Sequence, residues 1–269
     1  LFIKKYIPNN LKIITAYYLN KSYNPFNLKS QFLSDQAISD FFIWSNRFNS
    51  IYFIAENTHA LLKGEEEVVN HIFSFYSSKG SLLGEYKYKT KNYIEKIRLN
   101  TNFSDIEDKY ISFTHFTDEK ISLQKTLENN GFTSKPKISR QNRGYTIYFP
   151  DNDKIGSVVH GNFGGITSNN VKTAKQRSSF LYTPVYRFDK LSKYDLVFNN
   201  PTTKKLVVTA ISLNNKAIKT IYIDPMGTEF ISLKDFSGGI SFESKLPLCR
   251  PLIFKNPPPH SLGFDVFHG

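Results

Sequence analysis

Histidine is the side chain most often used for metal binding and for acid–base chemistry near neutral pH, and this chain has six. None lies two or four positions from another, so the close spacing that many zinc sites use is missing. Two of them, His160 and His268, each stand directly before a glycine at the end of an expected strand. We interpret both as structural side chains that bond a loop carbonyl. The sharper alternative is a ligand or metal contact at a rim, with His260 as a neighbour of His268.

Other residue sets that carry catalysis are missing from the sequence. It has no Gly-x-Ser-x-Gly elbow for a nucleophilic serine and no glycine-rich loop that would cradle phosphate. The carboxylates mostly stand singly. Arg250 lies in an apolar segment and needs a carboxylate, a carbonyl or an interdomain surface as its partner. We therefore assign no catalytic residue and expect no metal or cofactor, and Arg250 joins His160, His260 and His268 as a ligand-binding candidate.

Short strands must position these side chains, because runs rich in β-branched and aromatic residues follow one another between Gly, Asn, Asp and Pro. The alternation in residues 218–223 and 86–89 is typical of antiparallel strands with one buried face. A helix is expected at 118–130, while 28–39 is ambiguous. The expected strands cover residues 12–18, 50–55, 68–76, 82–89, 93–99, 110–116, 145–149, 157–160, 179–182, 194–199, 205–213, 217–223, 229–233, 239–243, 251–255 and 264–267.

Similar elements recur in the same order in the two halves of the chain. Residues 73–99 resemble residues 209–233, and each stretch predicts a hairpin followed by a third strand. Upstream of these stretches, a strand ends at Asn57 in one half and at Asn200 in the other. Downstream, two further strands end at His160-Gly161 and at His268-Gly269. The parallels predict an internal duplication, with the helical insertion confined to the first copy.

The predicted fold class is all-β with minor α. It consists of two tandem antiparallel β-sandwich units, immunoglobulin-like or jelly-roll-like, related by internal duplication. We expect residues 1–40 to form an N-terminal strand and connecting segment that packs on the first unit. Residues 41–162 are then the first sandwich, residues 163–178 a Gly/Asn-rich linker, and residues 179–269 the second sandwich.

Composition sets limits on the compartment and the partners. The chain has 269 residues, 40% of them hydrophobic, which supplies two cores. Its single cysteine, Cys249, excludes an internal disulfide framework. We expect a soluble protein, because the sequence shows neither a signal peptide nor the roughly 18 apolar residues that cross a bilayer. A chain that begins without Met leaves a removed leader open, so the compartment stays unassigned. The net charge of +12 comes from scattered lysines rather than from a basic arm.

The function expected from these observations is that of a non-enzymatic binding or structural protein. Its rim loops or edge strands would engage a protein or glycan partner, or a second copy in a homo-oligomer. Two alternatives stay open. One is a carbohydrate-active or metal-dependent enzyme with a rim site near His160 and His268. The other is binding of a polyanion, a nucleic acid or an acidic glycan, through Lys and aromatic side chains.

Overall fold

The computed structural model describes residues 38–57, 66–99, 106–117, 141–142, 144–150, 155–167, 176, 178–214, 216–246, 249–256 and 264–269. Within these residues all regular secondary structure is β. The described part of the chain contains no helix long and apolar enough to cross a membrane. The strand expected at 12–18, the helix expected at 118–130 and His260 lie outside the described residues.

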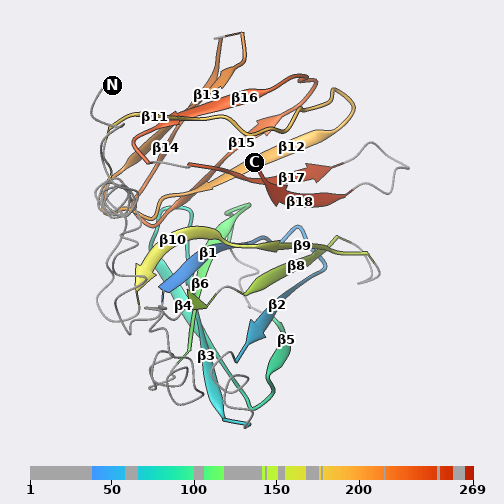
Figure 1. Ribbon diagram of the computed structural model, residues 1–269, viewed down its shortest axis with the longest axis vertical. Coiled ribbons are helices and arrows are strands. Elements are labelled where there is room, and N and C mark those ends of the chain that lie inside the picture. Colours follow the sequence, from blue (N-terminus) through green and yellow to red (C-terminus); the bar gives the residue numbers. More distant parts are fainter. Residues whose placement is uncertain are drawn as a thin grey trace, which may run out of the picture.

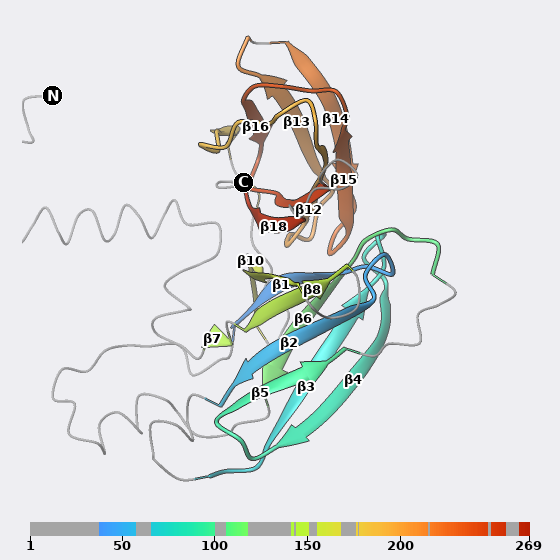
Figure 2. The same ribbon diagram turned by 90° about the vertical axis from the view of Figure 1, so that its right-hand side faces the viewer.

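Two sheets formed by the first half of the chain pack face to face, and we call this pair the first sandwich (Figures 1 and 2). One sheet has the order β10-β1-β6-β3-β4, with β7 beside β1, and the other has the order β5-β2-β8-β9. Every pairing is antiparallel except that of β1 with β7. The strands are β1 (Ile38–Trp44), β2 (Ser50–Glu56), β3 (Val69–Tyr76), β4 (Leu82–Thr90), β5 (Ile94–Arg98), β6 (Ile111–Thr117), β7 (Gln141–Asn142), β8 (Tyr145–Phe149), β9 (Ser157–His160) and β10 (Asn162–Thr167).

A second pair of sheets, the second sandwich, follows along the chain and lies above the first in Figure 1. Its sheets have the orders β11-β16-β13-β14 and β15-β12-β17-β18, and all of their pairings are antiparallel. The strands are β11 (Phe180–Tyr182), β12 (Lys193–Asn199), β13 (Leu206–Ser212), β14 (Ala217–Ile223), β15 (Thr228–Leu233), β16 (Ile240–Ser244), β17 (Leu252–Asn256) and β18 (Asp265–His268).

The two sandwiches have the same connectivity. Replacing β1–β6, β8 and β9 by β11–β16, β17 and β18 converts the orders β1-β6-β3-β4 and β5-β2-β8-β9 into those of the second sandwich. The register agrees as well: His160 lies opposite Tyr145, and His268 lies opposite Leu252 at the matching place. Positions can therefore be compared one by one between the sandwiches.

Fifteen of the sixteen expected strands fall in the described residues, and all fifteen are confirmed, with bounds that agree within one or two residues. Three strands, β1, β7 and β10, were not predicted. β10 starts at Asn162, the last residue expected in the first sandwich, and continues through residues 163–167 of the expected linker, where it pairs with β1. Gly161, just before it, serves close backbone approach rather than flexibility: a Cβ there would lie 2.6 Å from the carbonyl oxygen of Phe41.

Aromatic side chains hold the sheets of each sandwich together. In the first, the rings of Phe42 on β1 and Phe53 on β2 are 5.0 Å apart between centroids, edge to face. In the second, Phe198 on β12 and Phe242 on β16 make the same kind of contact at 5.1 Å. The inward positions of both sheets are buried, as alternation along each strand requires.

A pair of buried histidines interrupts the apolar core of the first sandwich. His71 Nδ1 lies 2.9 Å from His115 Nε2, and the two rings are stacked. Burial lowers the pKa of His115 well below its ordinary value, and the facing ring of His71 lowers it further. His115 is therefore neutral in the folded protein.

This pair predicts acid sensitivity. We expect the free energy of unfolding to fall as the pH drops below about 6.5. Below that pH the side chain of His115 is protonated in the unfolded chain but stays neutral in the folded protein. The contribution of neutral His115 to the free energy of unfolding is fully present above about pH 6.5. As the pH falls from there towards the lowered pKa of the folded state, it is lost at about 1.4 kcal/mol per pH unit. Urea unfolding between pH 7.5 and 5.5 measures the slope. In the variant His115→Gln this slope should decrease by the amount that corresponds to one proton taken up on unfolding. An unchanged slope would contradict the assignment of His115 as neutral in the folded protein.

Candidate functional site

One end of the first sandwich packs against the second. This end, the first rim, is made by residues 45–49 between β1 and β2, residues 77–81 between β3 and β4, and residues 106–110 directly before β6. It lies on the outer face of sheet β15-β12-β17-β18, and Figure 2 shows β12, β15 and β18 on the side of the second sandwich that faces the first. The fit is close at the β3–β4 turn, where a Cβ on Gly80 would lie 1.9 Å from the carbonyl oxygen of Pro225.

Phe254 of β17 closes the first rim. Its side chain points out of the second sandwich, yet it is fully buried, because it enters the end of the first. Its ring centroid lies 5.0 Å from that of Tyr110, 5.7 Å from that of Phe48 and 5.3 Å from that of Tyr148. Tyr148 belongs to the first core and donates a hydrogen bond of 2.7 Å to the carbonyl oxygen of Ile43. Phe254 thus joins the first core to the second sandwich.

Asp195 of β12 is the polar centre of the same junction. Its carboxylate accepts from Arg47 at 2.7 Å and from Lys109 at 2.8 Å. The hydroxyls of Tyr110 and Ser232 each donate to it at 2.6 Å. Burial raises the pKa of Asp195, but the hydrogen bonds from Lys109, Ser232 and Tyr110 outweigh burial and hold the pKa below its ordinary value. The carboxylate is therefore charged and fully engaged.

The two equivalent histidines meet at this junction. His268 Nε2 lies 3.0 Å from His160 Nδ1 and 2.9 Å from the carbonyl oxygen of His160. His160 Nδ1 also lies 3.0 Å from the carbonyl oxygen of Gly161. Farther along the same strands, Ser157 Oγ donates to Asp265 at 2.8 Å, so edge strands β9 and β18 run side by side. The structure thus brings His160 and His268 together as a contact between sandwiches, in which His268 lies next to a carbonyl oxygen of the other sandwich.

The remaining sequence candidates lie apart from this contact. Arg250 precedes β17 and is half-buried, and its charge acts on Tyr182, whose pKa burial raises and Arg250 lowers. Cys249 is buried, and burial raises the pKa of its thiol to about 11, so it is a protonated core residue. Within the described ranges no group of three or more His, Cys, Asp or Glu side chains is placed to hold a metal ion.

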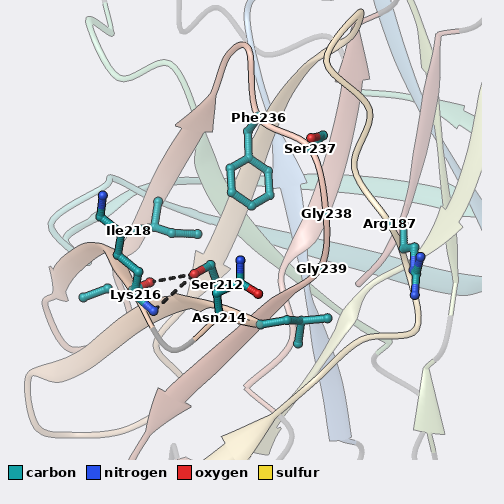
Figure 3. Close-up of a pocket in the computed structure, with 11 residues that line it drawn as sticks. Arg187, Ser212, Asn214, Lys216, Ile218, Phe236, Ser237, Gly238 and Gly239 are labelled. Atoms are coloured by element: carbon teal, nitrogen blue, oxygen red, sulfur yellow. Dashed lines mark hydrogen bonds between the residues drawn. The ribbon is translucent and has the colours of Figure 1, made fainter.

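The corresponding end of the second sandwich, the second rim, is made among the described residues by residues 183–192, 213–214, 216 and 234–239. It contains a hollow of about 650 Å³ between the β13–β14 hairpin and residues 236–239 (Figure 3). The ring of Phe236 points towards the hairpin in that view, and Lys216 is held by two hydrogen bonds between its backbone and Ser212 Oγ. Leu213 lies against Gly239, where a Cβ would come within 2.5 Å of Leu213 Cδ1. The described lining includes the cations Arg187 and Lys216 and no carboxylate.

Apart from His160 and His268, sequence reasoning missed the residues that form the junction and the hollow. Asp195 was the most detectable, because a carboxylate inside the run Tyr194-Asp195-Leu196-Val197-Phe198 needs a buried partner. Phe254 and Phe236 carry no such signal, since aromatic residues make up 15% of this chain. Comparisons of the chain with protein-family models, with curated proteins and with solved structures find no match.

Proposed function

We propose that the protein is a non-catalytic binding protein whose second rim engages a glycan or protein partner. The observation that carries this proposal is the difference between two equivalent ends. The apolar end of the first rim is covered by Phe254 from the second sandwich, with a cavity beside it that both sandwiches line. The hollow of the second rim, about 650 Å³, is lined among the described residues by the second sandwich alone. The first rim thus packs on another sandwich, whereas the equivalent second rim is open.

The chemistry of the hollow indicates what would fill it. Phe236, Leu213 and Ile218 offer apolar surface, and Leu213 is more than half exposed. Arg187 and Lys216 add positive charge at its edge. A side chain or sugar with one apolar face and a nearby acidic group fits this lining. Its apolar face would cover the apolar side chains of the hollow, and its acidic group would pair with Arg187 or Lys216.

Methyl and amide NMR of the whole chain tests this proposal with a panel of neutral and acidic oligosaccharides and acidic peptides. We expect a binding member to shift Leu213, Ile218 and Gly239. The variant Leu213→Lys should weaken that binding at least about tenfold, because it places a charge in the apolar part of the hollow.

Leu181→Lys is the matched control, since Leu181 is also an exposed leucine of the second sandwich but lies on β11, outside the lining. A ligand whose affinity is the same in both variants binds elsewhere and contradicts the proposal. Turnover of any panel member that one side-chain substitution abolishes would favour the enzyme alternative instead.

A second candidate function, polyanion binding, is favoured by the outer face of sheet β5-β2-β8-β9. There Lys96 Nζ lies 4.0 Å from the ring centroid of Tyr52 and 5.1 Å from that of Phe149. Arg98 lies opposite Tyr52, and Tyr145 of the same sheet is 41% exposed. Basic and aromatic side chains on one sheet face are the combination that binds single-stranded nucleic acid.

Fluorescence titration with a single-stranded oligonucleotide at several salt concentrations measures this function. Replacing both Lys96 and Arg98 by Gln should reduce the slope of log K against log salt by about 1.4, as expected for two lost phosphate contacts. Lys87→Gln with Lys89→Gln makes the same charge change on exposed positions of β4. Equal effects of the two double variants would show that only net charge matters.

We also propose that the two sandwiches descend from one duplicated unit. The shared strand order and the equivalent positions of His160 and His268 support this origin. In architecture the units belong with two-layer sandwiches such as immunoglobulin-like and jelly-roll domains, although their strand order differs from the A-B-E-D and C-F-G sheets of an immunoglobulin constant domain.

A further inference from the structure

Four basic side chains surround a cavity of about 650 Å³ at the junction, which we call the junction cleft. Arg47 and Lys109 reach it from the first rim, and Lys193 and Lys234 from the ends of β12 and β15. Lys193 has the same strand parity as Asp195 and so extends from the outer face of the sheet, and Lys234, directly after the end of β15, lines the same cavity. Side chains from both sandwiches therefore converge on one space.

The charges of this lining do not cancel. Four cations face one carboxylate, Asp195, which leaves three positive charges among the described lining residues. Asp195 is already used by Arg47 and Lys109. Lys234 lies 3.9 Å from the exposed carboxylate of Asp235, which is a weak surface contact. A cleft lined by charge of one sign concentrates ions of the opposite sign.

We infer that the junction cleft binds a phosphate or sulfate group carried on a small organic body. The size of the cavity lies in the range of about 300–1,000 Å³ that holds small molecules and exceeds what a bare oxyanion needs. Arg47 is fixed by Asp195 and by Asn256 Oδ1, to which its Nη2 donates at 2.7 Å. Lys193 and Lys234 supply the adaptable ammonium groups, and Leu191 and Leu233 offer an apolar wall to the organic part.

Titration calorimetry of the whole chain, with ionic strength held constant by sodium chloride, tests this inference. The ligands are inorganic phosphate, inorganic sulfate, glucose 6-phosphate and glucose. We expect saturable binding of glucose 6-phosphate that is tighter than that of either inorganic ion, and no binding of glucose. Replacing both Lys193 and Lys234 by Gln should weaken glucose 6-phosphate binding by about tenfold or more, because both charge-assisted contacts are lost.

The double variant Lys87→Gln with Lys89→Gln removes the same charge from exposed positions of β4, outside the lining of the junction cleft and of the second rim, and should change the affinity less than about twofold. Both pairs of lysines are exposed, so we expect the double variants to fold like the unmodified chain. A thermal melting curve of each variant checks this. Absence of saturable binding by the unmodified chain overturns the inference, and so does an equal loss in the two double variants. Unaltered binding after the Lys193 and Lys234 changes also overturns it. Glucose 6-phosphate bound at the second rim instead would keep its affinity in the Lys193 and Lys234 variant, so the two proposals are told apart.

Discussion

The substitution Phe254→Ala is expected to lower the free energy of unfolding by about 3–5 kcal/mol, the cost typical of truncating a fully buried phenylalanine. The loss arises at the junction, since the ring contacts Phe48, Tyr110 and Tyr148 rather than the core of its own sandwich. Without it the end of the first core opens to water. We expect urea unfolding to change from one transition to two, as the sandwiches lose their coupling.

Two valines at equivalent positions provide a matched control. Val266 on β18 lies opposite Phe254, and Val158 on β9 lies opposite Ile147 at the corresponding place of the first sandwich. Val266 is 2% exposed, because the junction covers it, whereas Val158 is 57% exposed. We expect Val266→Ala to cost about 1–2 kcal/mol and Val158→Ala less than about 0.5 kcal/mol. Equal costs would mean that the junction does not form in solution.

A second large effect is expected from Asp195→Asn, which keeps the shape of the side chain but removes its charge. Arg47 and Lys109 would face each other without a carboxylate, and the donors on Tyr110 and Ser232 would lose a charged acceptor. Breaking a largely buried ion pair by removing one partner costs about 3 kcal/mol or more. The free energy of unfolding from urea titration should fall by that amount.

The double variant Arg47→Gln with Asp195→Asn separates the pair from the other contacts. We expect it to be more stable than the sum of the single changes predicts, because no unpaired guanidinium is left. Asp224→Asn is the control, since Asp224 pairs with Lys205 at the surface and should cost less than about 1 kcal/mol. A loss at Asp195 no larger than at Asp224 would contradict its role as the centre of the junction.

Local sequence patterns were sufficient for the strands. Alternation in residues 218–223 and 86–89 fixes which side chains face a sandwich core, and β14 and β4 follow these patterns. The strands that were missed lack such a pattern. β10 contains Gly164-Gly165 and forms because β1 supplies its hydrogen-bonding partner, which is information from elsewhere in the chain.

For the candidate site, the sequence located His160 and His268 at equivalent positions but gave no indication that they touch each other. Their contact depends on how β9 and β18, more than a hundred residues apart, are placed side by side. The hollow beside Phe236 and the basic lining of the junction cleft likewise combine loops from separate parts of the chain.

By itself the sequence determined the succession of strands and, where alternation is clear as in residues 218–223 and 86–89, the inward face, because alternation depends on neighbours two residues apart. Similar segments in the same order also indicated which positions of the two halves correspond. Only the tertiary structure decided which outer faces are covered. Val158 and Val266 share a residue type and a strand position, yet one is exposed and the other buried. The reason is that an outward side chain is buried only where another sandwich is placed against it. That placement closes the first rim with Phe254 and leaves the second rim open.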